Sequence, residues 1–174
     1  RVDVNQAWDE AAAERGIAAL ADAGCELVEQ PLPRDLRNAT VRLTARAAIP
    51  IMADESLHGP AEAFDLAASG GARAFAIKIA QSGGLHAAHD VAMIGAAAGM
   101  GLYGGTMLEA GVGTAASAHL FSTLPSLSWG TELFGPLLLT EELLTTSLAY
   151  ADFELAVPNG PGLGVEIDED KLQH

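Results

Sequence analysis

The 174-residue chain has little cysteine and little positive charge. Cys25 is the only cysteine, so no disulfide can form within the chain, which is typical of a protein of the reducing cytoplasm. Lys and Arg number 9 against 23 Asp and Glu, giving a net charge of −14 that argues against nucleic acid or an anionic membrane as a partner. A small anionic substrate is not excluded, because a metal ion and one or two lysines can reverse the field locally.

Long apolar runs and aromatic side chains are also scarce. No unbroken apolar stretch approaches the roughly 18 residues of a transmembrane helix, and we expect no signal peptide. Aromatic residues make up 5% and hydrophobic residues 49% of the chain, a balance typical of helices packed tightly on a sheet. The length is that of one domain. We therefore predict a cytoplasmic protein with a single α/β domain.

The chain is organised around the apolar run Pro50–Ala53, which ends in Asp54 and Glu55. Such a run, opened by proline and closed by a turn, predicts a buried strand. A carboxylate at the end of a buried strand costs several kcal/mol unless a cation or a hydrogen-bond network meets it. Asp54 therefore requires a partner.

The same pattern of a short apolar run with one charged residue recurs around Asp3, Glu29 and Lys78. The steps from Asp3 to Glu29, to Asp54 and to Lys78 are 26, 25 and 24 residues, the period of consecutive βα units. In a (β/α) barrel all strand ends meet at one mouth, so we expect these four side chains to converge. Three carboxylates at one point suit a hard divalent cation, Mg²⁺ or Mn²⁺.

Six parallel strands are expected, at residues 1–5, 26–30, 50–54, 74–79, 100–103 and 129–134. Asp9 is expected to cap a helix that runs to about residue 23, and Pro60 to open one that ends near Gly70. We predict barrel units over residues 1–135 and a C-terminal extension of the same domain over 136–174. Because a parallel barrel needs eight strands, we expect the chain to be the C-terminal part of a longer protein.

Two further residues are candidates for catalysis. Lys78 lies among apolar residues, where lysine is rarely buried unless paired. It forms a structural ion pair with Asp54 or Glu55, or it is a catalytic lysine with a lowered pKa, and both can hold at once. Glu132, in the sixth predicted strand, is either a hydrogen-bonded core residue or an acid that contacts substrate. Asn5 and Glu55 could orient the metal ligands.

Other polar residues have ordinary explanations. His86 and His89 stand three apart on a predicted helix without a third metal ligand nearby, so we expect them to face solvent. Cys25 is predicted to lie in the core. Gln81–Gly84, which opens a helix, is only a weak signal for an anion site. The pair Gly104-Gly105 allows the backbone to approach a ligand closely.

The chain resembles the muconate cycloisomerase (muconate lactonizing enzyme) family of the enolase superfamily. The order Asp, Glu, Asp, Lys marks the superfamily, and the motifs Tyr-Gly-Gly-Thr-Met-Leu-Glu and Gly-Thr-Glu-Leu-Phe-Gly-Pro are similar to those of the cycloisomerase branch, closer to the muconate than to the chloromuconate enzymes. The matching segments span essentially the whole chain: Arg1–Gln6, Val28–Pro31, Ala53–Ser56, Ile77–Ile79, Tyr103–Glu109 and Trp129–Pro136.

The resemblance implies a modified TIM-type (β/α)₇β barrel with Mn²⁺ or Mg²⁺ held by Asp3, Glu29 and Asp54. It implies interconversion of cis,cis-muconate, a small dicarboxylate, and muconolactone through an enediolate-like intermediate, in aromatic-compound catabolism by the β-ketoadipate pathway. Lys78 would flank the intermediate, and Glu132 would match the acid of the last barrel strand. The resemblance also implies a homo-oligomer.

One part of the family pattern is missing from these residues. The proton-transferring lysine of the family lies in a Lys-x-Lys motif on the strand before Asp3, and an N-terminal domain closes the mouth. We therefore expect this chain alone to be inactive and poorly stable, with an open sheet edge. The alternatives are another enolase-superfamily enzyme (a dipeptide epimerase, a sugar-acid dehydratase or a chloromuconate cycloisomerase) or a non-catalytic half-barrel with a structural role.

Overall fold

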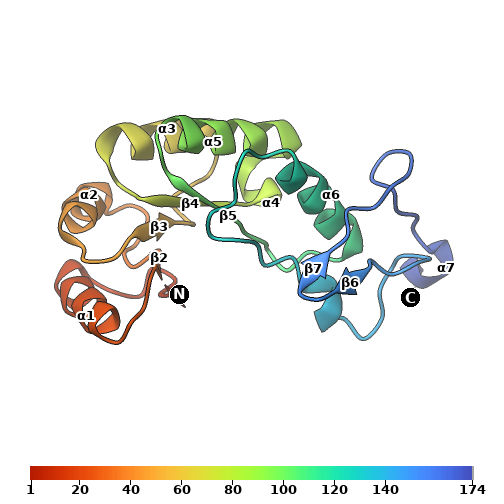
Figure 1. Ribbon diagram of the computed structural model, residues 1–174, viewed down its shortest axis with the longest axis horizontal. Coiled ribbons are helices and arrows are strands. Elements are labelled where there is room, and N and C mark those ends of the chain that lie inside the picture. The colour runs from red at the N-terminus through yellow and green to blue at the C-terminus, as the bar shows by residue number, and fades with distance from the viewer. Residues whose placement is uncertain (174) are drawn as a thin grey trace.

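The computed structural model describes residues 1–173 as a row of βα units followed by an irregular C-terminal stretch (Figure 1). Five parallel strands form one sheet in sequence order: β1 (Val2–Asp3), β2 (Val28–Glu29), β3 (Ile51–Ala53), β4 (Ala74–Ile77) and β5 (Gly101–Gly104). The helices between and after them are α1 (Glu10–Asp22), α2 (Arg37–Arg46), α3 (Pro60–Ser69), the short α4 (Ile79–Ser82), α5 (Leu85–Ala97) and α6 (Gly111–Ser122). The predicted parallel α/β fold is confirmed.

The helix boundaries follow local sequence signals. The Asp9 carboxylate accepts a hydrogen bond from the main-chain N–H of Ala12 at 2.7 Å and so caps α1. Pro60 occupies the first turn of α3, where its missing N–H would have no partner in any case. Gly70 ends α3 with a φ of 70°, a left-handed conformation that glycine adopts without strain. These predicted caps are confirmed.

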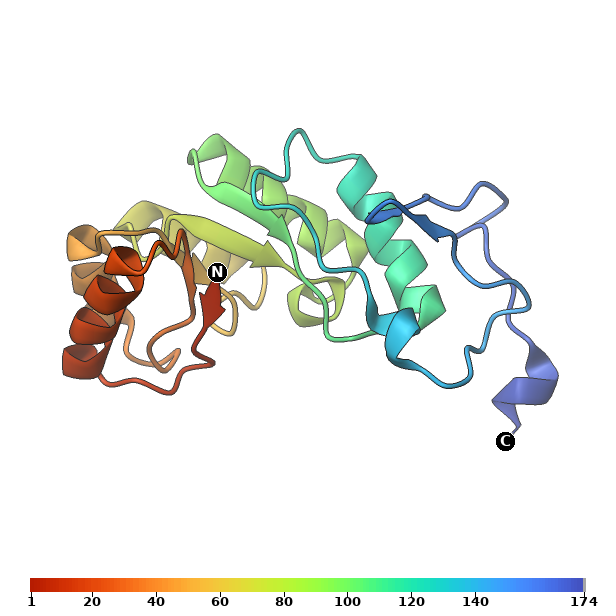
Figure 2. The same cartoon turned by 60° about the horizontal axis from the view of Figure 1, so that its bottom comes forward.

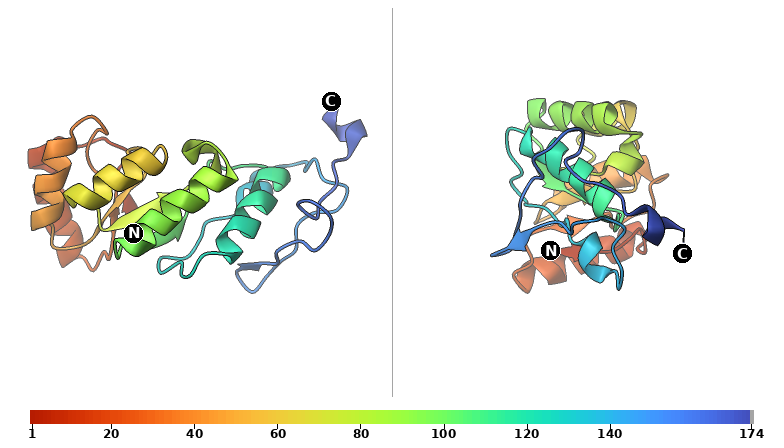
Figure 3. Two further views of the ribbon diagram at one scale, coloured as in Figure 1. Left: turned by 90° about the horizontal axis from the view of Figure 1, so that it is seen from above. Right: turned by 90° about the vertical axis from the view of Figure 1, so that its right-hand side faces the viewer.

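Alternate residues of the sheet face two different layers. Phe75 and Ile77 of β4 pack under α3, α5 and α6, whereas Ala74 and Ala76 join Met52 on the opposite face. Helices α3 and α5 lie side by side over the sheet (Figure 3). The opposite face carries a smaller cluster that also contains Leu27 and Tyr103.

The sixth predicted strand, residues 129–134, is wrong. A single parallel bridge joins Gly104 to Thr131. Three main-chain hydrogen bonds link the segment to β5, from Trp129 N to Leu102 O (3.1 Å), from Gly104 N to Gly130 O (2.9 Å) and from Glu132 N to Gly104 O (3.1 Å). Gly130 has a φ of 76°, which turns the backbone out of the extended conformation just before the bridge. Within residues 1–173 the sheet therefore has five strands and does not close into a barrel.

The C-terminal stretch loses the βα pattern, as predicted. It contains the 3₁₀ helix η1 (Gly135–Leu138), a hairpin of β6 (Tyr150–Ala151) and β7 (Glu154–Leu155), and α7 (Glu169–Leu172), and it extends away from the sheet (Figure 2). The Tyr150 hydroxyl donates to the main-chain oxygen of Leu133 at 2.8 Å and ties the hairpin to the preceding segment. None of the helices in residues 1–173 is long and apolar enough to cross a bilayer. The domain boundary at residue 135 stays a prediction.

Phe75 provides a test of this core. Its side chain is fully buried between β4 and the helices, so Phe75→Ala should lower the free energy of unfolding by about 3–5 kcal/mol. Phe64, on the outer face of α3, is 65% exposed, and Phe64→Ala should change it by less than about 0.5 kcal/mol. Urea denaturation of the full-length protein measures both, and equal losses for the two variants would contradict this packing.

Candidate active site

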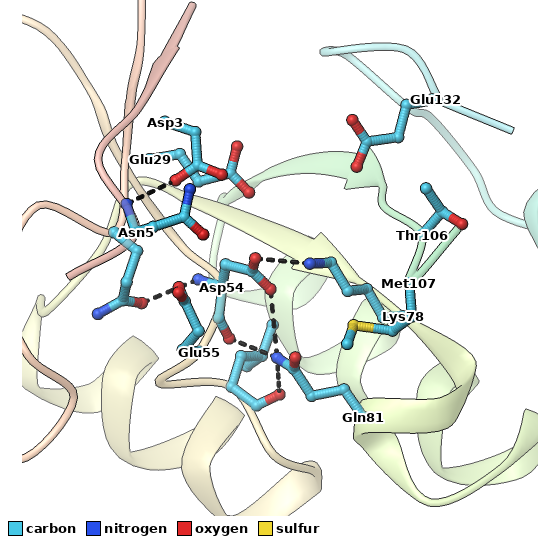
Figure 4. Close-up of polar contacts among 12 residues, drawn as sticks. Asp3, Asn5, Glu29, Asp54, Glu55, Lys78, Gln81, Thr106, Met107 and Glu132 are labelled. Carbon is cyan, nitrogen blue, oxygen red and sulfur yellow. Dashed lines mark hydrogen bonds and ion pairs between the residues drawn. The ribbon is translucent and has the colours of Figure 1, made fainter. Parts of the chain in front are cut away.

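The predicted site residues gather at the C-terminal ends of the strands (Figure 4). Asp3 and Glu29 are the last residues of β1 and β2, and Asp54 and Lys78 directly follow β3 and β4. Glu132 faces them from the segment beside β5. The parallel sheet thus brings together the residues that the βα period predicts, whereas their chemical roles stay predictions.

Lys78 and Asp54 form a buried ion pair. The Lys78 Nζ atom lies 2.5 Å from Asp54 Oδ2, and both side chains are buried. Because both charges are buried, removing one partner would leave the other with the full desolvation penalty, so the pair is costly to break. Gly105 makes room for the lysine, since a Cβ atom there would lie 2.9 Å from Lys78 Cε. We expected the backbone at this glycine pair to approach a ligand closely; in the structure, the backbone of Gly105 lies against the Lys78 side chain.

Gln30, which the sequence analysis missed, holds the loop after β3. Its Oε1 accepts hydrogen bonds from the main-chain N–H groups of Asp54 and Ser56, both at 3.1 Å. Its Nε2 donates to Leu32 O and Ser56 Oγ, both at 2.8 Å. Every hydrogen-bonding position of this buried carboxamide is satisfied. A polar residue between a strand-ending glutamate and a proline was the only signal for it in the sequence.

Glu29 is the least satisfied group of the site. Its Oε2 atom is buried without a hydrogen-bond donor, and the closest cation is Arg1, whose Nε lies 3.6 Å away. Burial and then the nearby charge of Asp3 raise the pKa of Glu29 to about 8, against the opposing effect of Arg1. The Glu55 Oε2 atom is buried without a donor too, and burial raises the pKa of Glu55.

Arg1 connects the two sides of the site. Its Nη2 donates to Glu132 Oε2 at 2.8 Å, and its guanidinium lies 4.3 Å from the centroid of the Tyr103 ring, a cation–π contact. Although burial works against the charged form, the hydrogen bond to Glu132 and the charge of Glu29 raise the pKa of Arg1. Arg1 stands two residues before Asp3, and this i, i+2 spacing could have placed both on one face of the strand.

The three carboxylates fit a divalent cation by their chemistry. Among residues 1–173, no three His, Cys, Asp or Glu side chains are already drawn into a metal-binding cluster. Asp54 is instead bound to Lys78, and Asp3 Oδ1 accepts from the main-chain N–H of Asn5 at 2.9 Å. A buried carboxylate oxygen without a donor, beside two like charges, is nevertheless the environment that a hard cation stabilises.

The remaining candidates lie outside the site or differ from expectation. His86 and His89 are exposed on α5, as predicted. Cys25 is only half-buried, and its Sγ lies 3.2 Å from Leu27 O, so the predicted core position is wrong. Gly24 ends the preceding helix next to it and leaves this thiol near the surface. The Gln81 side chain turns back toward Asp54.

The raised pKa of Glu29 makes stability depend on pH. Because the folded protein binds this proton more tightly than the unfolded chain does, stability should fall as the pH rises from about 4.5 to about 8. Glu29→Gln should remove this loss and make the metal-free protein more stable than wild type at pH 8, by roughly 2 kcal/mol. Denaturation at pH 5 and pH 8 with a chelator measures it. The exposed Glu26→Gln is the control, and parallel pH profiles for wild type and Glu29→Gln would contradict the assignment.

Comparisons with known proteins identify the family of the chain. A model of the enolase C-terminal domain-like family matches residues 1–171. Muconate cycloisomerase 1-1 of Acinetobacter lwoffii is 60% identical over 99% of this chain and 45% of its own length, and muconate cycloisomerase 1 of Pseudomonas putida is 55% identical over 99% and 46%. A chloromuconate cycloisomerase of Delftia acidovorans is 49% identical over the whole chain and 47% of its own length.

A solved structure shows the same fold. The muconate lactonizing enzyme from Pseudomonas fluorescens, in complex with muconolactone, superposes with a TM-score of 0.97 at 56% identity, over 99% of this chain and 47% of that one. The chain thus spans about half the length of the curated relatives that it matches. On the match over residues 1–171 and these identities, the chain belongs to the enolase C-terminal domain-like family, with muconate cycloisomerases among its close relatives.

Proposed function

We propose that the full-length protein is a muconate cycloisomerase, which interconverts cis,cis-muconate and muconolactone with the help of Mn²⁺ or Mg²⁺. Identities of 55–60% to muconate cycloisomerases over nearly the whole chain support the substrate class. The observation that carries the proposal is the buried, donor-free oxygen of Glu29 beside Asp3 and Asp54, with Lys78 opposite. A divalent cation would offset the negative charge of the carboxylates and, together with Lys78, would attract an anionic substrate.

Asp3, Glu29 and Asp54 would hold the metal. Bound there, the metal would act as a Lewis acid that offsets the negative charge developing on a substrate carboxylate. The three carboxylates suit a metal ion because they repel one another: the charges of Asp3 and Asp54 both raise the pKa of Glu29. The main-chain N–H of Asn5 already orients Asp3, and Gln30 holds the loop of Asp54.

Lys78 would act on the reacting part of the substrate. In the direction of lactone formation, one carboxylate oxygen adds to a carbon of the double bond, and the neighbouring α-carbon takes up a proton. The enediolate-like intermediate between these steps is anionic, so a buried ammonium beside it supplies counter-charge or carries a proton. Glu132, held by Arg1 across the mouth, would be the acid that contacts the substrate from the other side.

The proposed proton transfer needs a further lysine. By resemblance to the family, that lysine belongs to a Lys-x-Lys motif before the strand of Asp3. Lys171, the only other lysine of this chain, lies in α7, where its Nζ donates to the main-chain oxygens of Glu142 and Leu144. We therefore propose that residues 1–174 alone do not turn over muconate. A homo-oligomeric assembly and a cytoplasmic location are also proposed, supported by the likeness to the cycloisomerases.

Muconate consumption by the full-length protein tests the function. Loss of muconate ultraviolet absorbance should require Mn²⁺ or Mg²⁺, and Lys78→Ala should lower kcat by about a hundredfold or more. Lys171→Ala is the matched control and should retain kcat, because Lys171 binds main-chain oxygens away from the site.

A substrate panel distinguishes the alternatives. Chloromuconates, dipeptides and sugar acids should be converted less efficiently than muconate, as judged by kcat/KM. Turnover of a dipeptide or a sugar acid with muconate left unchanged would refute the cycloisomerase and favour another enolase-superfamily reaction. Absence of any metal-dependent turnover in the full-length protein would favour a structural role.

A further inference from the structure

Gln81 makes three polar contacts with the loop that carries Asp54. It lies in α4, three residues after Lys78, and its side chain turns back toward the end of β3 (Figure 4). Its Nε2 lies 2.5 Å from the main-chain oxygen of Asp54, 3.0 Å from that of Leu57 and 3.3 Å from Asp54 Oδ1. All three partners are oxygen acceptors, so the side chain acts through its N–H donors.

Asp54 is consequently held on every side by another part of the chain. Gln30 accepts from its main-chain N–H, Gln81 donates to its main-chain oxygen, and Lys78 binds its carboxylate. The Asp54 side chain is only 6% exposed, so water cannot readily replace a lost partner. In such surroundings an unmatched polar group is costly, and these contacts therefore fix both the backbone and the carboxylate of Asp54.

Gln81 and Lys78 belong to one short segment. The main-chain N–H of Ser82 donates to the oxygen of Lys78 at 3.0 Å, which closes the single turn of α4. Gly83 and Gly84 follow with φ values of 95° and 123°, a backbone path suited to glycine, and lead directly into α5. The segment therefore holds the amide of Gln81 and the ammonium of Lys78 in a fixed relation.

We propose that Gln81 is a positioning residue that holds Asp54 ready as a metal ligand. This inference rests on the metal site of the proposed function. Its two shorter contacts use the main-chain oxygens of Asp54 and Leu57, so they fix the loop without occupying the Asp54 carboxylate. The ion pair with Lys78, in contrast, uses a carboxylate oxygen that a metal would also require. Gln81 can therefore keep Asp54 in place whether or not Lys78 binds it.

The test uses Gln81→Met in the full-length protein, because methionine has a similar length and no donor. Mn²⁺ affinity, measured by calorimetry, should fall about tenfold or more, as for other residues that orient metal ligands. Activity on muconate should recover at high Mn²⁺, since the defect is one of affinity. In the metal-free protein, the amide of Leu57, which donates to Asp54 O at 2.8 Å, should exchange faster with solvent. Gln173→Met, at an exposed position, is the matched control.

A second variant tests the donor role itself. Gln81→Lys supplies N–H donors at comparable reach and should return the exchange of the Leu57 amide in the metal-free protein close to the wild-type rate. Exchange as fast as in Gln81→Met would overturn the donor argument, and this readout is independent of the repulsion between an added ammonium and Mn²⁺. Wild-type Mn²⁺ affinity in Gln81→Met would overturn the inference even if its melting temperature were lower, because that result indicates a merely structural role. A wild-type protein that binds no Mn²⁺ would instead refute the proposed metal site, and the inference with it.

Discussion

Repulsion between carboxylates at one edge of a parallel sheet is the constraint on which the rest of the site depends. Consecutive βα units place Asp3, Glu29 and Asp54 at successive strand ends. The register of the parallel strands fixes these positions, so the three carboxylates cannot move apart unless the register changes. Two cations offset part of this repulsion: Lys78 pairs with Asp54, and Arg1 lies beside Glu29. A donor-free oxygen is still left on Glu29, so the balance of charge is incomplete in the protein by itself. A divalent cation would supply the positive charge that is still missing.

The two interpretations of Lys78 weighed from the sequence describe one geometry. A lysine that is paired with Asp54 is held in a single rotamer, buried and close to the carboxylates. Those are also the properties that a lysine needs if it is to meet an anionic intermediate without first losing conformational freedom. In the proposed mechanism this ion pair is the resting arrangement of Lys78. Gly105 provides space for the lysine, and Gln81 contacts the loop that carries Asp54.

The sequence was informative where a signal was local or periodic. The spacing of charged residues predicted four of the five strands and the edge at which they end. Asp9 and Pro60 marked helix starts because capping depends on a few adjacent residues. The segment 129–134 failed because its composition suits a strand, but its pairing with β5 stops at Glu132 and is interrupted by the left-handed backbone of Gly130. Gln30 and Gln81 could not have been assigned from the sequence. Both bind main-chain groups of the loop around Asp54, which is distant in the sequence, and main-chain contacts leave no pattern in the residue types.

The hydrogen bond from Arg1 to Glu132 has a consequence for the order of folding. It joins residues 131 positions apart, whereas each βα unit is held by contacts between neighbours in the sequence. Contacts of such long range require closure of a large loop and therefore form late. Glu132 follows β5 in the sequence, so it can reach Arg1 only after the residues of β1 to β5 have been made. Of the charged residues gathered at this edge of the sheet, Glu132 is therefore the last to be synthesised.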